Sequence, residues 1–208
     1  MSEALNRATR AMTEAELPAM VLDHAELPAE LRELHPLRAG VLDNATMAQQ
    51  GFPGNTAESF RAIGRIDGYL REFAARAPEG GSIPSGYDLA AATVVHLFDD
   101  PQGVSRWMQE IFLQQFEANV DREFQPGQHL LLVERLQFRG FSDEVTGLRA
   151  LQSGTMGPVS STVVDFRVGR VLGVAYVATF GNCERRALVE RLGLELERKI
   201  VRVVLGAL

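Results

Sequence analysis

The sequence contains very little lysine and cysteine. Lys199 is the only lysine among the 208 residues, so arginine supplies nearly all of the positive charge. Cys183 is the only cysteine, which excludes an internal disulfide and any zinc site built from several cysteines. We interpret Cys183 as a small residue in the first turn of a helix. The functional alternative is a thiolate stabilised by the start of that helix.

The sequence also lacks a long apolar run. Residues 1–20 are polar and do not contain the apolar segment of a signal peptide. No transmembrane segment is predicted, because the longest helical pattern carries too many charges to span a bilayer. As written, the chain is expected in the cytoplasm, whereas an export signal trimmed from its start would make it extracytoplasmic.

The charge balance and the composition limit the classes of partner. A formal net charge of −6 opposes a role in binding nucleic acid or an anionic membrane. The chain is 46% hydrophobic and 23% charged, as is typical of globular proteins, and it is long enough to bury a core without a metal or a disulfide. The expected partner is therefore an unknown small molecule or protein.

Residues 159–180 have the pattern of a long β-hairpin. In the first strand, Val164 and Phe166 alternate with Asp165, which is the period of two expected for a half-buried strand. The second strand, residues 171–180, is apolar on both faces. This pattern predicts a strand that is central in its sheet or covered on both sides.

The turn of this hairpin is expected at residues 167–170. Valine tolerates a positive φ angle poorly, so Val168 disfavours a two-residue turn of type I′. We predict instead a type I turn in which Gly169 adopts the left-handed conformation and forms a G1 bulge.

A strongly amphipathic helix is predicted from Cys183 to Leu205, with Asn182 as its N-cap. Charged residues on its other face are spaced for ion pairs one turn apart, such as Glu195 with Lys199. Its apolar stripe contains Leu188, Leu192, Leu196, Ile200 and Val203 or Val204.

Short helices and strands are expected in the first half of the chain. Asp43 and either Asn55 or Thr56 are placed to cap two brief helices. Residues 64–73 fit a helix or a strand, and two glycines favour the strand. The pattern of residues 31–39 fits either a helix or an edge strand.

A strand over residues 87–98 is followed by a helix that starts at Asp100–Pro101 and runs to Ala118. Residues 121–127 are the one candidate for an internal linker. A strand or buried run follows at residues 129–133, and a strand follows at residues 145–151. Short turns join most strands, which indicates antiparallel pairing. The predicted class is α+β: a mainly antiparallel sheet of about six strands packed by two long amphipathic helices, plus short N-terminal helices.

The domain organisation is predicted from the same pattern. Residues 1–16 are expected to form an N-terminal tail or helix, and residues 17–208 a single α+β domain. Each half of this domain ends in strands followed by one amphipathic helix, so residues 17–120 and 121–208 are candidate pseudo-halves.

His96 offers the one arrangement with a catalytic interpretation. It precedes Asp99 and Asp100 closely, so it could act as a general base oriented by either carboxylate. The simpler interpretation places His96 on the solvent-facing side of its strand and uses Asp100 as a helix N-cap. No residue is otherwise assigned to catalysis, no cofactor is expected, and no residues have the spacing of metal ligands.

The remaining distinctive residues have structural interpretations. Trp107 and the phenylalanines after it form either core or a ligand box, and core is favoured. Arg139 and Arg149 could bind an anion, and Asp143–Glu144 is interpreted as a solvated charge pair. Residues 80–86 lack the GK[ST] ending of a phosphate-binding loop and are expected to be a plain loop.

Several short phrases carry a resemblance to known proteins. They lie at residues 17–22 with 26–28, 43–45, 64–73, 97–103 and 163–171. On these residues the chain resembles a group of uncharacterised bacterial proteins of the Chloroflexi type. The resemblance implies exported proteins, often lipoproteins, with a plan similar to the PsbP/LpqN-like fold, and it brings no catalytic residues. This sequence differs from them in lacking a signal and a lipobox cysteine.

The leading functional hypothesis is a non-catalytic module whose sheet, packed by the Trp107 and Leu192 helices, presents a cleft to a ligand or a protein. The first alternative is a small-molecule enzyme of the hydrolase type that uses His96 with Asp99 or Asp100. The second is a self-associating structural protein that forms a homo-oligomer. A non-enzymatic role is favoured, because nearly every distinctive residue has a structural explanation.

Overall fold

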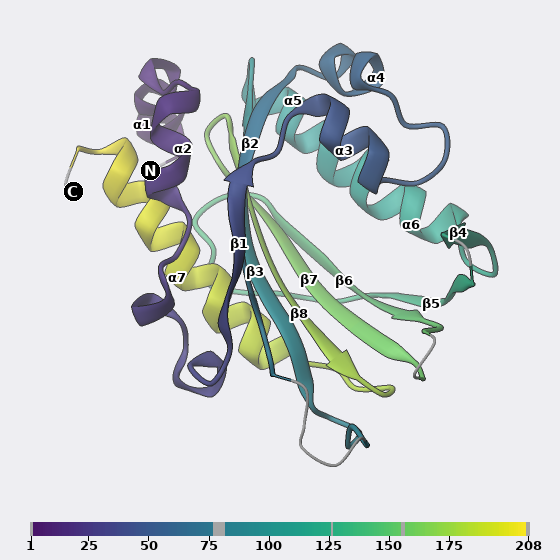
Figure 1. Cartoon of the computed structure of the whole chain (residues 1–208). Helices are drawn as coiled ribbons and strands as arrows, with labels where there is room; N and C mark the ends of the chain where they lie inside the picture. Colours follow the sequence, from purple (N-terminus) through teal and green to yellow (C-terminus); the bar gives the residue numbers. More distant parts are fainter. Residues whose placement is uncertain (1, 77–81, 126, 155–156, 207–208) are drawn as a thin grey trace.

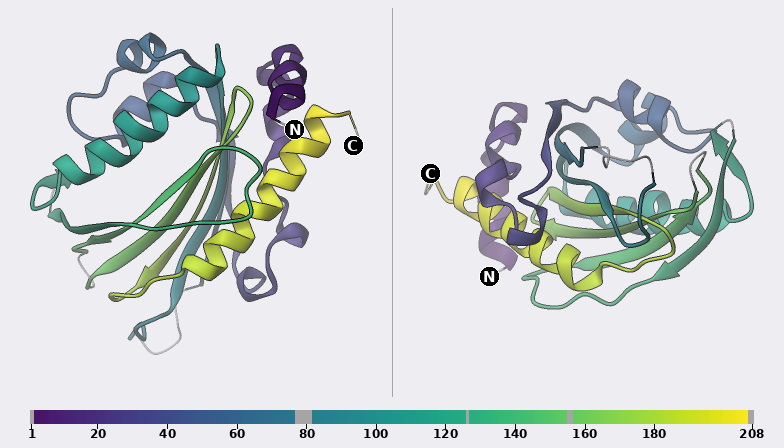
Figure 2. Two further views of the ribbon diagram at one scale, coloured as in Figure 1. Left: turned by 180° about the vertical axis from the view of Figure 1, so that it is seen from behind. Right: turned by 60° about the horizontal axis from the view of Figure 1, so that its bottom comes forward.

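The computed structural model describes residues 2–76, 82–125, 127–154 and 157–206. It contains an antiparallel sheet of eight strands in the order β1-β2-β3-β8-β7-β6-β5-β4. Helices cover both faces of this curved sheet (Figures 1 and 2). The predicted α+β class is therefore confirmed, and the sheet is larger than expected.

The strands are β1 (His35–Val41), β2 (Arg65–Ala74), β3 (Asp88–Phe98), β4 (Glu123–Gln125), β5 (Gln128–Arg135), β6 (Val145–Gln152), β7 (Val159–Val168) and β8 (Val171–Phe180). The helices are α1 (Ser2–Ala8), α2 (Leu17–Met20), α3 (Asn44–Gln50), α4 (Ala57–Ala62), α5 (Pro101–Arg106), α6 (Gln115–Ala118) and α7 (Arg186–Val204). Between α5 and α6 the chain is π-helical in η5 (Trp107–Gln114). The 3-10 turns are η1 (Thr9–Ala11), η2 (Glu14–Glu16), η3 (His24–Glu26) and η4 (Ala29–Leu31).

Most of the elements predicted from periodicity are present. Strand β2 confirms the strand chosen for residues 64–73, and β1 is the edge strand that residues 31–39 left open. Asp43 and Thr56 cap α3 and α4, and the Asp100 carboxylate accepts a 2.7 Å bond from the Gly103 N–H at the start of α5. The predicted loop at residues 77–86 lies partly outside the described residues.

Two predicted boundaries are wrong. Residues 121–127 include β4, which pairs with β5 in a short hairpin, so this stretch is not a linker. Helix α7 begins at Arg186, because the Cys183 and Arg185 N–H groups donate to Ser160 Oγ and Thr162 Oγ1 of β7 at 3.1 and 3.0 Å. The Asn182 side chain accepts a bond from Arg149 instead of capping the helix.

The turn between β7 and β8 is a two-residue loop, so the predicted G1 bulge is wrong. Val168 pairs directly with Val171 and the register does not shift. Gly169 has a φ angle of 57°, as predicted, and Arg170 is not among the residues with positive φ. A positive φ at the first loop residue alone is the pattern of a type II′ turn, which keeps Val168 within the strand.

The β7–β8 hairpin lies at the centre of the sheet and is buried on both sides, as predicted. Val164 and Phe166 face α7 and belong to a core shared with the apolar stripe of that helix and with α2. The alternate residues of both strands face the opposite side, where α5 and η5 contribute a second core around Trp107 and Met108. The sheet is therefore the middle layer of three.

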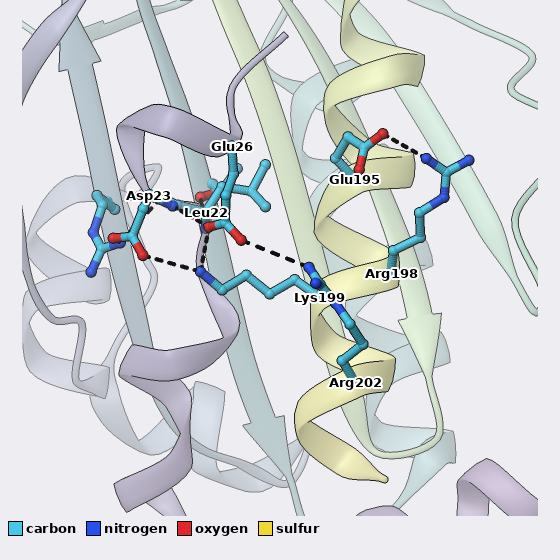
Figure 3. A network of polar contacts seen from close by, with 9 residues as sticks. Leu22, Asp23, Glu26, Glu195, Arg198, Lys199 and Arg202 are labelled. Carbon is cyan, nitrogen blue, oxygen red and sulfur yellow. Dashed lines mark hydrogen bonds and ion pairs between the residues drawn. The ribbon is translucent and has the colours of Figure 1, made fainter. Parts of the chain in front are cut away.

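Lys199 joins the N-terminal segment to α7. Figure 3 shows its ammonium group between the carboxylates of Asp23 and Glu26, and the distance to Asp23 Oδ2 is 3.3 Å. The Lys199 side chain is only 7% exposed. The predicted pairing of Lys199 with Glu195 is wrong, since Glu195 pairs with Arg198 on the helix surface.

We predict that Lys199→Met lowers the free energy of unfolding by about 1 to 2 kcal/mol, because it removes a partly buried charge-assisted pairing while the apolar stem is kept. The matched control is Arg198→Met, which removes the exposed pair next to it and should cost less than about 0.5 kcal/mol. Urea unfolding measures both values. If both substitutions lower the free energy of unfolding equally, the buried position of Lys199 adds nothing to stability beyond an exposed ion pair.

We predict that Gly169→Val costs about 1 to 3 kcal/mol, because valine would be held at a positive φ angle. A Cβ atom at this position would also overlap Thr9 Oγ1 of the N-terminal segment. Gly40→Val on the edge strand is the control, since a Cβ there meets nothing within 4 Å. Thermal unfolding compares the two, and an unchanged melting temperature for Gly169→Val would contradict the turn assignment.

Candidate functional site

A cavity of about 390 Å³ lies between the sheet and the helical run α5–η5–α6. Helices α3 and α4 lie on the same side of the sheet, opposite α7 (Figure 1). The cavity is lined mainly by apolar side chains. They include Leu42, Met47, Phe52, Phe60, Leu70, Ala92, Val94, Trp107, Ile111, Phe112, Phe116, Val163 and Val174.

The floor of the cavity consists of two neighbouring rows of residues that run across the strands. In the first row the strand registers align Ala92, Tyr176 and Val163. In the second row they align Val94 and Val174 with Asp165. Side chains at the same level of adjacent strands share one face of a sheet. Pairing of the central strands thus places one carboxyl group in a mostly apolar floor.

The roof is supplied by the π-helical segment and by α6. A π-helix joins each residue to the fifth one along, so residues five apart share a face. Trp107 and Phe112 are one such pair, and Ile111 and Phe116 are another; all four line the cavity. Next to them, Asn55 and Gln115 exchange two amide hydrogen bonds of 2.8 and 3.0 Å, which fix α6 to the α3–α4 connection.

Asp165 is the most unusual polar group of the cavity. Its side chain is 1% exposed, and Oδ1 has no hydrogen-bond partner among the described residues. Burial raises the pKa of this carboxyl well above its usual range, because the charged form is separated from water. An unpaired buried polar atom costs free energy. We therefore expect the ionised Asp165 to lower the free energy of unfolding.

A second polar group in the cavity wall is fully paired. The Tyr176 hydroxyl donates to Glu72 Oε1, and Arg38 Nε donates to Glu72 Oε2 at 2.6 Å. Burial, followed by the hydrogen bond to Glu72, raises the pKa of Tyr176 above its ordinary value. The hydroxyl stays protonated, and the charges of Glu72 and Arg38 offset each other.

His96 and Arg65 form a third polar group, at the end of the cavity beside Trp107. Arg65 Nε donates to His96 Nδ1 at 3.1 Å, and Nη1 donates to Asn44 Oδ1 at 2.7 Å. Burial lowers the pKa of Arg65 to about 10, so it remains charged at neutral pH. Burial and the Arg65 charge hold the pKa of His96 well below its usual range. A neutral His96 whose Nδ1 accepts from arginine carries its proton on Nε2.

Gly68 provides the space for this cluster. A Cβ atom there would lie 2.6 Å from both Arg65 Nη2 and His96 Nδ1. The glycine that favoured a strand over a helix in the sequence is therefore also required by the packing of two buried polar side chains.

The structure relocates several residues singled out in the sequence. His96 is 3% exposed, so its expected position on the solvent-facing side is wrong. Among the described residues its hydrogen-bond partner is Arg65, while Asp100 caps α5. Asp143 and Glu144 are not a solvated pair, because both interact with Arg167 of β7.

The structure also places the other candidate residues, some in the core and some in polar contacts. Trp107 and Phe112 belong to a core cluster, as favoured, and they also line the cavity. The interpretation of this group as a ligand box stays a prediction. Arg149 is engaged by Glu134 and Asn182. Cys183 precedes the first turn of α7 and lies 3.7 Å from Ser85 Oγ.

Within residues 2–76, 82–125, 127–154 and 157–206, no group of three or more His, Cys, Asp or Glu side chains could hold a metal ion. In the same part of the chain, no helix is both long and apolar enough to cross a membrane.

No protein-family model matches the chain, and no curated protein matches it. The fold is similar to the extracellular domain of PknH from Mycobacterium tuberculosis, with a TM-score of 0.60 and 9% sequence identity, over 92% of this chain and 97% of that chain. An Rv0999 ortholog from Mycobacterium smegmatis matches with a TM-score of 0.42 and 12% identity, over 88% of this chain and 97% of that chain. At such identities the likeness to PknH shows a shared fold.

We predict that Asp165→Asn stabilises the protein at neutral pH. The pKa of Asp165 is raised in the folded state. The contribution of Asp165 to the free energy of unfolding is therefore fully present below the pKa of the unfolded state, about 4, and is lost as the pH rises through the pKa of the folded state. The advantage of the variant should therefore be near zero at about pH 4 and grow by up to about 1.4 kcal/mol per pH unit above it.

Urea unfolding at several pH values measures this difference. Glu110→Gln is the control, because Glu110 is exposed on η5 and its removal also deletes one negative charge. A variant Asp165→Asn that is less stable than the parent at neutral pH would show that the carboxylate is held by a favourable interaction.

Proposed function

We propose that this protein is a binding module that holds an apolar small molecule in the cavity between the sheet and the helical run α5–η5–α6. The observation that carries the proposal is the cavity of about 390 Å³ with its apolar floor and roof. Ligand sites are commonly concave and apolar, with a few polar groups at fixed positions. The polar groups of this cavity correspond to that pattern.

The likeness to an extracellular domain of a known protein agrees with a binding role at the level of the fold. An exported location and a relationship to the Chloroflexi-type proteins remain parts of this proposal. A single domain from residue 17 onward is likewise proposed.

The geometry around His96 favours binding over catalysis. A general base needs a free lone pair directed at the proton that it removes. In His96 the Nδ1 lone pair accepts from Arg65, and the low pKa keeps the ring neutral, so its single proton lies on Nε2. The residue is thus suited to donate a hydrogen bond to a ligand. An enzyme that uses His96 with Asp99, and a self-associating structural protein, remain the alternatives.

We predict that Val174→Phe abolishes binding of apolar compounds. Val174 lies in the cavity floor and is half-buried, so a larger side chain there extends into the ligand space while the fold is kept. Calorimetric titration with decanol should show that Val174→Phe binds at least about tenfold more weakly than the parent.

Leu37→Phe is the matched control, because it adds the same ring to an exposed position of the edge strand β1. It should bind decanol as the parent does. The proposal is rejected if the parent binds neither decanol nor other apolar compounds, or if Val174→Phe binds them equally well.

A further inference from the structure

The carboxyl group of Asp165 lines the cavity and differs from the charged groups of Glu72 and Arg65 beside it. Glu72 is paired with Arg38 and Tyr176, and Arg65 is held by His96 and by Asn44. Asp165 is buried to the same degree as Arg65, yet its Oδ1 has no partner in the described part of the chain. A bound molecule that donates a hydrogen bond would remove this deficit.

We propose that the ligand of the cavity is an apolar molecule with one amino group, and that this group donates to the carboxyl of Asp165. The inference rests on the proposed function and specifies the chemistry of the ligand. The apolar body lies over the floor residues next to Asp165, such as Val174 and Val163, and under the roof residue Trp107.

The charges around the cavity favour an amine over an acid. The Arg38 cation is already offset by Glu72. Arg65 does not line the cavity, and Asp67 and Asp43 favour its charge. Asp165 does line the cavity, and its Oδ1 has no partner among the described residues. A ligand carboxylate would repel an ionised Asp165. A protonated Asp165 could donate one hydrogen bond to it, but that bond would leave the buried negative charge of the ligand without a cation. An ammonium group would gain a charge-assisted bond in surroundings of low dielectric constant, where such a bond is strong.

The raised pKa of Asp165 in the empty protein agrees with this inference. An ammonium group would draw the carboxyl into its ionised form, so binding of the amine would release a proton. An alcohol can donate to Asp165 as well, but it brings no positive charge to offset the buried carboxylate. The amine is therefore expected to bind more tightly than an alcohol of the same length.

Three compounds with the same chain test the inference: decylamine, decanol and decanoate, titrated into the protein by calorimetry below their aggregation concentrations. We expect decylamine to bind at least about tenfold more tightly than decanol. We expect decanoate to bind most weakly.

Asp165→Asn should reduce the affinity for decylamine to that for decanol and leave decanol binding unchanged. Glu110→Gln removes one exposed negative charge and should leave the preference for decylamine intact. Any binding of decylamine that persists in Val174→Phe measures attraction to the acidic surface. It is subtracted from the binding measured for the parent.

The outcomes separate the inference from the proposed function. If all three compounds bind the parent equally, or if Asp165→Asn keeps the preference for decylamine, the amine inference is overturned while the cavity remains a binding site. If none of the three binds, both proposals fail. The inference is supported if the preference for decylamine over decanol is lost in Asp165→Asn and kept in Glu110→Gln.

Discussion

The structure depends on the need of the central hairpin to be covered on both faces. Strand β8 carries apolar side chains in both directions, and β7 directs its largest one toward α7, so neither face of the hairpin can be left to water. On one face, α7 provides a regular apolar stripe that matches Val164 and Phe166. On the other, the cover is the shorter and less regular run α5–η5–α6. The three-layer arrangement follows from this single requirement.

The second cover does not fill the space above the sheet. Trp107 and Phe112 of the π-helical segment and Phe116 of α6 line the volume that remains, which is the cavity. This partly open cavity also contains a carboxyl group that lacks a full set of partners among the described residues. Stability is lowered at one location, which is typical of sites shaped by function rather than by folding.

The sequence allowed the fold to be predicted better than the site. Periodicity missed β4 and left β1 undecided, but it identified the other strands and both long helices, because alternation records which side chains share a face. It does not record what covers that face. Asp165 and His96 were therefore assigned to polar or solvent-facing sides, although α5 and η5 lie above them. Arg65 was not recognised as buried, since its acceptors, Asn44 and His96, come from separate parts of the chain.

The position of the single lysine has a consequence for chemistry on the protein. Lys199 carries the only side-chain amine of the sequence, and the segment with Asp23 and Glu26 covers it. An amine-directed acylating reagent can reach it only when that segment separates from α7, through local opening. The rate of acylation at Lys199, located by mass spectrometry, would thus report directly how often the N-terminal segment detaches from the rest of the molecule.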